Sequence, residues 1–396
     1  MLNIIHRLKS MHLLVESILS FLKFLLVLTI FQPVYSNEFI DLCNKKNKSK
    51  PLQETFHILE QKFEVKKCEN LFKELNTTKT LSLINTGINE FRPIQFFNNL
   101  KELKIIEDYI NGNDCSHYST RNVDFSPLSK LTNLNILTLS NFGIDNLSFI
   151  KSLKKLQHLN LPCNRISSLN YITDLKELWF LDLSTNNLTN VDGIENIADL
   201  RDLNIRNNSI FDINILSNLK NLGYLDAGNN LIESVPEMNN IYFLSLSSNK
   251  ITNNGIEGKR FPNLKQLLLA DNSLTKIYTP QYPENLWLYL IPKNRISVLD
   301  NIEKMKNLSG LDLSENPIDD LEVGKIDGNN LTSLNLSSTN ITRFPNKEKL
   351  PKLQILNISS NIIESITQAE FPPKLLKLVA NNNRISDLNL NNSNLW

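Results

Sequence analysis

The side chains most often used in catalysis and metal binding are sparse in this sequence. The 396 residues contain no G-x-x-x-x-G-K-[ST], G-x-S-x-G, H-E-x-x-H or C-x-x-C motif. One stretch is rich in acidic residues, but their spacing is not that of a calcium-binding loop. These residues are Asp312, Glu315, Asp319, Asp320, Glu322 and Asp327. The five histidines are scattered: His6, His12, His57, His117 and His158. We therefore expect no enzyme activity, no cofactor, no metal site and no small-molecule substrate.

Four cysteines are the other residues with covalent chemistry: Cys43, Cys68, Cys115 and Cys163. They are too few for a disulfide scaffold but enough for two bridges, and four cysteines allow three pairings. Whether they are oxidised depends on the compartment, so the N-terminal sequence matters.

Residues 1–36 have the layout of a secretory signal peptide. A basic start with Arg7 and Lys9 leads into an apolar run from Phe24 to Phe31, and small residues follow near Ser36. The alternative is an uncleaved signal anchor, since residues 13–31 are long enough to span a bilayer. Glu16 and Lys23 would make that span costly. We expect a secreted, periplasmic or cell-surface protein that touches a membrane only if this segment is kept.

The charge balance excludes some classes of partner. Lys and Arg total 42 against 41 Asp and Glu, a net charge of +1. Such balance argues against a polycationic surface for nucleic acid. The hydrophobic content of 41% is that of an ordinary globular protein rather than a disordered one.

The sequence contains a repeat of about 22 residues. Each copy has a Leu-x-Leu pair that is followed, in most copies, by Asn. Ten copies carry the Asn: Asn164, Asn186, Asn208, Asn230, Asn249, Asn272, Asn294, Asn316, Asn361 and Asn383. Four further copies place another residue there: Thr86, Asp108, Phe142 and Thr339. About fourteen copies in one register indicate a repeat architecture.

The pattern resembles the leucine-rich-repeat family, L-x-x-L-x-L-x-x-N-x-L, over roughly residues 76–390. The 22-residue copies are most similar to bacterial internalins and to a eukaryotic protein-phosphatase regulatory subunit. Some later repeats carry a proline in their convex segment, and in this they resemble the shorter repeats of bacterial effectors. These prolines are Pro236, Pro345 and Pro372. The internalin resemblance implies host attachment or invasion.

The spacing of apolar residues predicts the same fold. After Asn164 they recur in steps of three through Leu178, which is typical of turns and 3₁₀ helices. The final step of two, from Leu181 to Leu183, is the period of a strand. We expect an α/β solenoid, a horseshoe of about fourteen repeats with a parallel concave sheet and a convex side rich in 3₁₀ turns. The repeat Asn residues should form a structural hydrogen-bond ladder.

The remaining segments predict the ends of the solenoid. We assign residues 37–76 to a partly helical N-terminal cap, 77–390 to the repeats with an insertion at 111–122, and 391–396 to the C-terminal end. Cys43 and Cys68 bracket the predicted cap helix, where a bridge would clamp it in an oxidising compartment. Unpaired thiols are the alternative.

Cys115 and Cys163 form the second expected pair. Cys115 lies in the insertion, and Cys163 lies beside Asn164 at the same end of a strand two copies later. Two strand spacings are about 10 Å, which a loop of this length can cross. Free thiols again remain the alternative.

The outward strand positions predict the binding surface. They lie six, four and two residues before the repeat Asn, and in the middle copies they combine aromatic, aliphatic and acidic side chains. We expect these residues to contact a partner: Phe180, Asp182, Asp202, Arg206, Tyr224, Asp226, Phe243, Leu268, Leu288 and Leu290. Exposed aromatic groups within a polar rim are typical of binding surfaces, although drift between repeats would give the same pattern.

The sequence thus favours a secreted or surface-exposed protein that binds another protein on its concave face. An intracellular regulatory scaffold, or an injected bacterial effector built from the same repeats, is the alternative.

Overall fold

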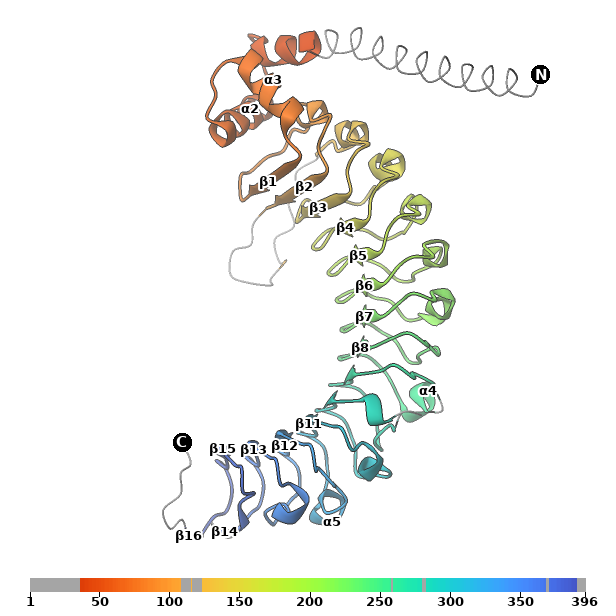
Figure 1. Cartoon of the computed structure of the whole chain (residues 1–396), viewed down its shortest axis with the longest axis vertical. Coiled ribbons are helices and arrows are strands. Elements are labelled where there is room, and N and C mark those ends of the chain that lie inside the picture. Colours follow the sequence, from red (N-terminus) through yellow and green to blue (C-terminus); the bar gives the residue numbers. More distant parts are fainter. Residues whose placement is uncertain are drawn as a thin grey trace, which may run out of the picture.

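The computed structural model describes residues 36–107, 115, 123–257, 259–279, 283–367 and 370–389. Its main feature is one parallel sheet of 14 strands that follow one another in sequence order, with β15 beside β13. The strands line the inner side of a long arc, as Figure 1 shows, with the N-terminal helices at one end. The predicted open solenoid with a concave parallel sheet is confirmed.

Every strand is short, and neighbouring strands pair at equivalent repeat positions, so that Leu159, Leu181 and Leu203 lie side by side. The strands of the main sheet are β1 Thr80–Ile84, β2 Glu102–Ile106, β3 Ile136–Ser140, β4 His158–Asn160, β5 Phe180–Asp182, β6 Asp202–Asn204, β7 Tyr224–Asp226, β8 Phe243–Ser245, β9 Gln266–Leu268, β10 Leu288–Leu290, β11 Gly310–Asp312, β12 Ser333–Asn335, β13 Ile355–Asn357 and β15 Lys377–Val379.

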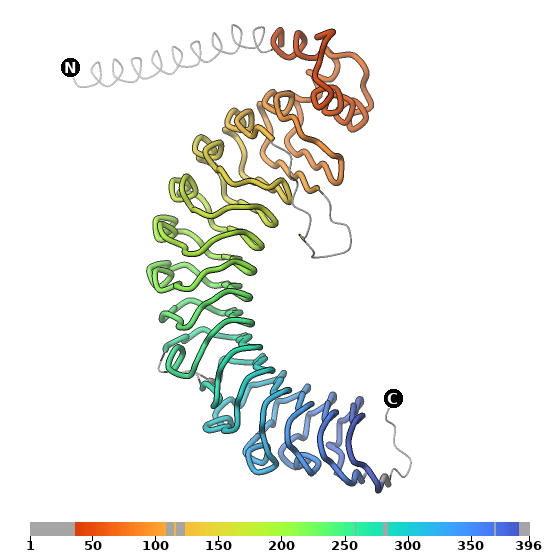
Figure 2. Tube along the Cα trace, turned by 180° about the vertical axis from the view of Figure 1, so that it is seen from behind, coloured from red at the N-terminus to blue at the C-terminus, as the bar shows by residue number. Residues whose placement is uncertain are grey.

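The convex side is built mainly from single 3₁₀ turns, as the three-residue apolar spacing predicts, and Figure 2 shows them along the outer edge of the arc. These are η1 Ile94–Phe96, η2 Ser126–Lys130, η3 Ser148–Ser152, η4 Ile172–Asp174, η5 Ile194–Asn196, η6 Asn214–Asn218, η7 Pro283–Asn285, η8 Ile302–Lys304 and η9 Lys347–Lys349. Four-residue helices replace them at α4 Asn253–Ile256 and α5 Asp320–Val323. Near the C-terminal end, β14 Ser365–Thr367 pairs with β16 Asp387–Asn389.

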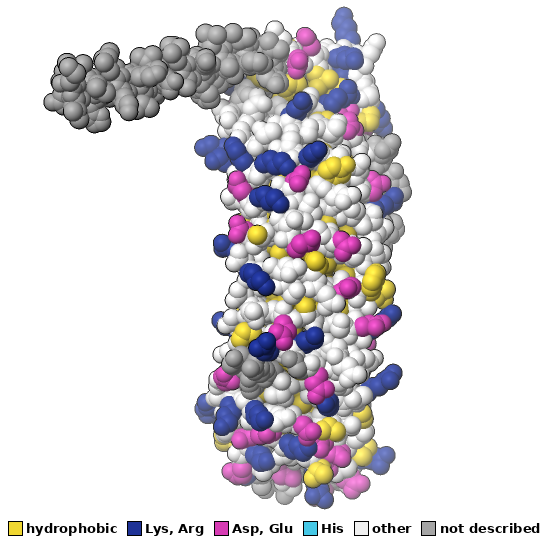
Figure 3. Space-filling view, turned by 90° about the vertical axis from the view of Figure 1, so that its right-hand side faces the viewer, with side chains coloured by type: hydrophobic (Ala, Val, Ile, Leu, Met, Phe, Trp, Pro, Cys, Tyr) yellow, Lys and Arg dark blue, Asp and Glu magenta, His cyan; other side chains and the backbone are white. Residues whose placement is uncertain are grey.

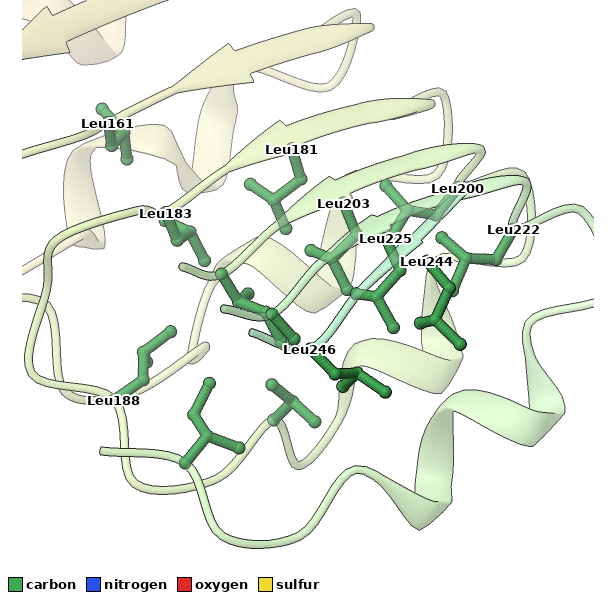
Figure 4. Packing of buried hydrophobic residues seen from close by; sticks show 14 of the residues in the cluster. Leu161, Leu181, Leu183, Leu188, Leu200, Leu203, Leu222, Leu225, Leu244 and Leu246 are labelled. Carbon is green, nitrogen blue, oxygen red and sulfur yellow. The ribbon is translucent and has the colours of Figure 1, made fainter. Parts of the chain in front are cut away.

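The core runs through the middle of the solenoid between the sheet and the convex turns. In the three-residue strands β4 to β13 the central residue is buried, and its two neighbours are mostly only partly covered, as in β5. Leucines of successive repeats therefore stack in layers, and Figure 4 shows Leu181, Leu203 and Leu225 in such a row. Burying one Leu side chain contributes roughly 1.5–3 kcal/mol. No single repeat encloses its own leucines, so the stability arises from stacking.

The repeat Asn residues join each turn to the preceding repeat, and Asn186 illustrates the arrangement. Its Nδ2 donates to the carbonyl oxygens of Leu161 (3.0 Å) and Leu183 (3.0 Å). Its Oδ1 accepts a hydrogen bond from the backbone N–H of Ile166 at 2.9 Å. Equivalent bonds are made by all ten Asn residues of the repeat. These side chains satisfy backbone groups that the irregular turns leave unpaired.

Copies without Asn use other side chains. Glu107 accepts hydrogen bonds from the Thr86 hydroxyl (3.1 Å) and the Gly87 N–H (2.8 Å). The acceptor before the insertion is thus Glu107, one residue earlier than the Asp108 that the sequence alignment placed there; residue 108 lies outside the described residues. Phe142 instead packs against Phe91 and Phe125 in the core, with ring centroids 5.8 Å away in each case.

The N-terminal cap consists of a helical segment at residues 36–44, α2 Lys50–Phe63 and α3 Cys68–Thr77. Apolar residues of α2 at helical spacing, Leu52, Phe56 and Leu59, are buried. Phe39 is fully buried between the Phe56 and Phe96 rings, at centroid distances of 5.7 and 5.3 Å. The cap thereby closes the apolar interior at the first repeat.

Two disulfides are present. Cys43–Cys68 joins the segment 36–44 to α3, with Cα atoms 5.9 Å apart. Cys115–Cys163 spans 48 residues, with Cα atoms 5.5 Å apart, and ties position 115 to the turn after β4. These are the two pairings that we expected.

Several expectations concern residues outside this description. They are residues 1–35 of the signal peptide or anchor expected at 1–36, most of the insertion expected at 111–122, and the C-terminal end at 391–396. Across the described segments, no helix has the length and apolar character needed to cross a bilayer.

Candidate partner-binding face

The concave face is formed by the two strand residues that flank each buried central residue. Pairing in register aligns them in two rows that run across the sheet. The first row contains Phe180, Asp202, Tyr224 and Phe243, and the second contains Asp182, Asn204, Asp226 and Ser245. Seven of the ten residues expected to bind a partner therefore lie together on or beside β5–β8. We call this set the aromatic–acidic band: Phe180, Asp182, Asp202, Arg206, Tyr224, Asp226 and Phe243.

The rings of the band form two separate pairs. Phe180 lies against His158 of β4 with ring centroids 3.8 Å apart. Tyr224 and Phe243 stack at 4.3 Å with their planes 6° apart. Both distances are shorter than the strand spacing of about 4.8 Å, so in each pair the rings lean toward each other. Asp202 lies between Phe180 and Tyr224 and therefore between the two ring pairs.

The carboxylates of the band differ in their partners. Asp182 accepts hydrogen bonds from the Ser184 N–H (2.8 Å) and the Asn204 amide (3.2 Å). Asp226 lies 4.0 Å from the Arg206 guanidinium. Burial raises the pKa of Asp182, and these hydrogen bonds only partly offset it. The band is thus a partly desolvated surface rich in negative charge.

Tyr242 belongs to this surface although the sequence analysis did not select it. It immediately precedes β8, and its hydroxyl lies 3.5 Å from Asp202 Oδ1. The ring crosses Gly223, where an added Cβ would lie 2.6 Å from a ring carbon. Only glycine therefore permits this approach. Burial raises the pKa of Tyr242, and the negative charge of Asp202 adds to the effect.

A row of exposed aromatic side chains along the N-terminal edge of the sheet was also missed. Trp179, Tyr242 and Trp287 each occupy the position just before a strand, and all three are exposed. Other repeats have Gln157, Arg201 or Lys265 at that position. The sequence signal that could have identified this row is an aromatic residue seven positions before the repeat Asn.

The remaining expected residues lie apart from the band. Leu268 is on β9, and Leu288 and Leu290 are on β10. The two β10 leucines line a shallow hollow of about 340 Å³ that extends to Ile355 and Val379. Gly310 keeps it open, since a Cβ there would lie 2.7 Å from a Leu288 methyl group. The concave face thus has an acidic aromatic part and a more apolar part.

The convex face is different in character. Figure 3 shows Lys and Arg intermixed with Asp and Glu there, with hydrophobic side chains scattered rather than gathered. Single exposed apolar residues are normal on any surface. No grouping of three or more potential metal ligands occurs within the described part of the chain.

Comparisons with known proteins agree with this fold. A family model of leucine-rich repeats (two copies) matches residues 329–370. Keratocan of Gallus gallus is 34% identical over 155 residues, which are 37% of this chain and 43% of keratocan. This chain therefore spans less than half the length of that curated relative.

Solved structures are similar over more of the chain. An internalin, InlF, of Listeria monocytogenes aligns with a TM-score of 0.67 at 19% identity, over 88% of this chain and all of InlF. TLR13 in its complex with ssRNA13 aligns with a TM-score of 0.58 at 22% identity, over 80% of this chain and 48% of TLR13. At such identities the likeness concerns the fold alone.

The fold and its exposed concave sheet define an open solenoid of the kind that mediates protein–protein interaction. The chain is therefore similar to leucine-rich-repeat proteins, and its 22-residue repeats resemble those of the bacterial internalins.

Proposed function

We propose that this chain is an extracellular or surface-exposed protein that holds a protein partner against the aromatic–acidic band. The observation that carries the proposal is the band itself. It places three solvent-accessible rings, Phe180, Tyr224 and Phe243, among carboxylates on four consecutive strands. Aromatic anchors surrounded by polar groups dominate the energy of many protein interfaces.

The charge of the concave face favours a protein over a nucleic acid. The outward positions of the main sheet carry five acids against two lysines and one arginine: Glu102, Asp182, Asp202, Asp226 and Asp312, and Lys104, Lys377 and Arg206. A surface that neutralises phosphates needs the opposite balance. The ssRNA in the TLR13 complex is therefore a poor guide to the partner of this chain.

The disulfides support an extracellular location. Bridges such as Cys43–Cys68 persist in oxidising compartments and are reduced in the cytosol. They disfavour an intracellular scaffold or an injected effector. Host attachment, as the internalin resemblance implies, is the finer proposal, and its support is the likeness of the folds.

A triple substitution tests the proposal. Phe180→Ser, Tyr224→Ser and Phe243→Ser together should weaken binding of the native protein partner by at least about 100-fold, as expected for lost hot-spot residues. The matched control is Phe211→Ser with Leu321→Ser, two exposed apolar residues outside the main sheet. Circular dichroism should show both variants folded. Equal affinity of the triple variant and the wild type would refute the proposal.

A further inference from the structure

Asp202 lies between Phe180 and Tyr224 on the concave face, and this position suggests what the partner must present. We propose that Asp202, with Phe180 and Tyr224 on either side, is a slot for an arginine side chain of the protein partner. The inference rests on the proposed function and names the chemistry of its central contact. We call these three residues the Asp202 slot.

The acids of the band have few positively charged partners. Among the described residues, neither Asp182 nor Asp202 forms an ion pair, and Asp226 has only the exposed Arg206 at 4.0 Å. Within the described part of the chain, the Asp202 carboxylate accepts only the long hydrogen bond from Tyr242. Three carboxylates on β5–β7 thus face solvent with a single cation beside them.

The rings on either side of Asp202 are spaced so that a side chain of the partner can reach its carboxylate. Phe180 and Tyr224 occupy the same row two strands apart, with the smaller Asp202 between them. Two strand spacings are about 9.6 Å. Each ring also leans away from Asp202, toward His158 and Phe243 respectively. This gap is wider than the roughly 7–8 Å that would sandwich a planar guanidinium, so an arginine would lie over the Asp202 carboxylate with its face against one of the two rings.

The surface around Tyr224 is partly shielded from water. Burial is the largest cause that raises the pKa of Tyr224, and the charges of Asp226, Asp182 and Asp202 raise it further. The negative charges of all three carboxylates are therefore felt at Tyr224. Charge interactions are strengthened where water is partly excluded, so a partner cation gains more here than at an ordinary surface acid.

Another acid of the sheet, Asp312, resembles Asp182 in its hydrogen bonds but has no aromatic neighbour, so it distinguishes the effect of charge from that of the rings. Asp312 of β11 accepts hydrogen bonds from the Ser314 N–H (2.9 Å) and the Asn335 amide (3.1 Å), as Asp182 does from Ser184 and Asn204. Its neighbours on the concave face are Leu290 and Asn335 rather than aromatic rings. Asp312 is therefore the matched control.

The test uses two small probes, acetyl-arginine-amide and acetyl-citrulline-amide, which have nearly the same shape but differ in charge. The full chain is labelled with 3-fluorotyrosine, and the ¹⁹F resonances of Tyr224 and Tyr242 are assigned with Tyr→Phe variants. The arginine probe should shift both resonances in a saturable way, with about tenfold higher affinity than the citrulline probe. Asp202→Asn should abolish this preference, Asp182→Asn should reduce it, and Asp312→Asn should leave it unchanged.

Equal binding of the two probes, no shift of either tyrosine up to the solubility limit, or an unchanged preference in Asp202→Asn would each overturn the slot. Those results would leave the proposed function standing, because it is judged separately by the ring substitutions against the native protein partner. Isosteric Asn variants preserve the strand, and an unchanged melting temperature shows that the lost preference is not due to unfolding.

Discussion

Tyr224 and Phe243 stack nearly parallel, 4.3 Å apart, across the boundary between β7 and β8. The repeat between them is the shortest of the solenoid, 19 residues from Asn230 to Asn249, and its described residues include no convex helix. The strands nevertheless pair in register, Tyr224 opposite Phe243. The shortening is therefore absorbed on the convex side, and the concave face keeps its row of rings.

The ladder predicts a measurable cost for removing one Asn. Asn186→Ala leaves the buried N–H of Ile166 and the carbonyl oxygens of Leu161 and Leu183 without their partner. We expect the free energy of unfolding to fall by about 1–3 kcal/mol, measured by urea denaturation. Thr339→Asn should be neutral or stabilising, because it restores the ladder residue. A fully stable Asn186→Ala variant would contradict this account of the turns.

Much of the fold could be predicted from the sequence because the repeat reports the packing directly. Leucines two residues apart mark the strand, apolar residues three apart mark the convex turn, and each Asn lies where backbone groups need a partner. Fourteen copies in one register leave few alternatives. In the copy before the insertion the aligned residue, Asp108, lies outside the described residues, and the neighbouring Glu107 accepts hydrogen bonds from Thr86 and Gly87.

The candidate site was less predictable. Strand alternation placed Phe180, Tyr224 and Phe243 on the concave face, but the leaning of the rings in pairs depends on contacts between repeats. The role of Tyr242 depends on the absence of a side chain at Gly223, one repeat earlier. Spacing within a single repeat carries no information about either relationship.

The second disulfide predicts a specific peptide map. A non-reducing digest should yield one peptide that links Cys115 to Cys163 and another that links Cys43 to Cys68. Both bonds should resist alkylation in the native oxidised protein. The Cys43–Cys68 bond closes a segment of 25 residues, and its removal should destabilise the cap by about 3 kcal/mol. Alkylation of native Cys115 or Cys163 would rule out that pairing.

His158 should titrate at an unusually low pH. Burial lowers the pKa of its imidazole, while the charges of Asp182, Asp202 and Glu102 oppose the shift. Between the lowered pKa and the ordinary value of about 6.5, the folded state binds fewer protons than the unfolded state. This contribution to stability is therefore present above pH ~6.5 and is lost as the pH falls through the folded-state pKa. NMR titration gives the value directly. Asp202→Asn should lower it further, and a pKa above 6.5 would show that the carboxylates dominate.

The position of the partner tests the central claim most directly. A photo-crosslinking amino acid is placed at Tyr242, beside the Asp202 slot, or at Leu321, an exposed position on α5. Each variant is irradiated in complex with the native protein partner. Binding on the concave face predicts a strong cross-link from position 242 and none from 321. A cross-link from 321 alone, with position 242 silent, would contradict the account.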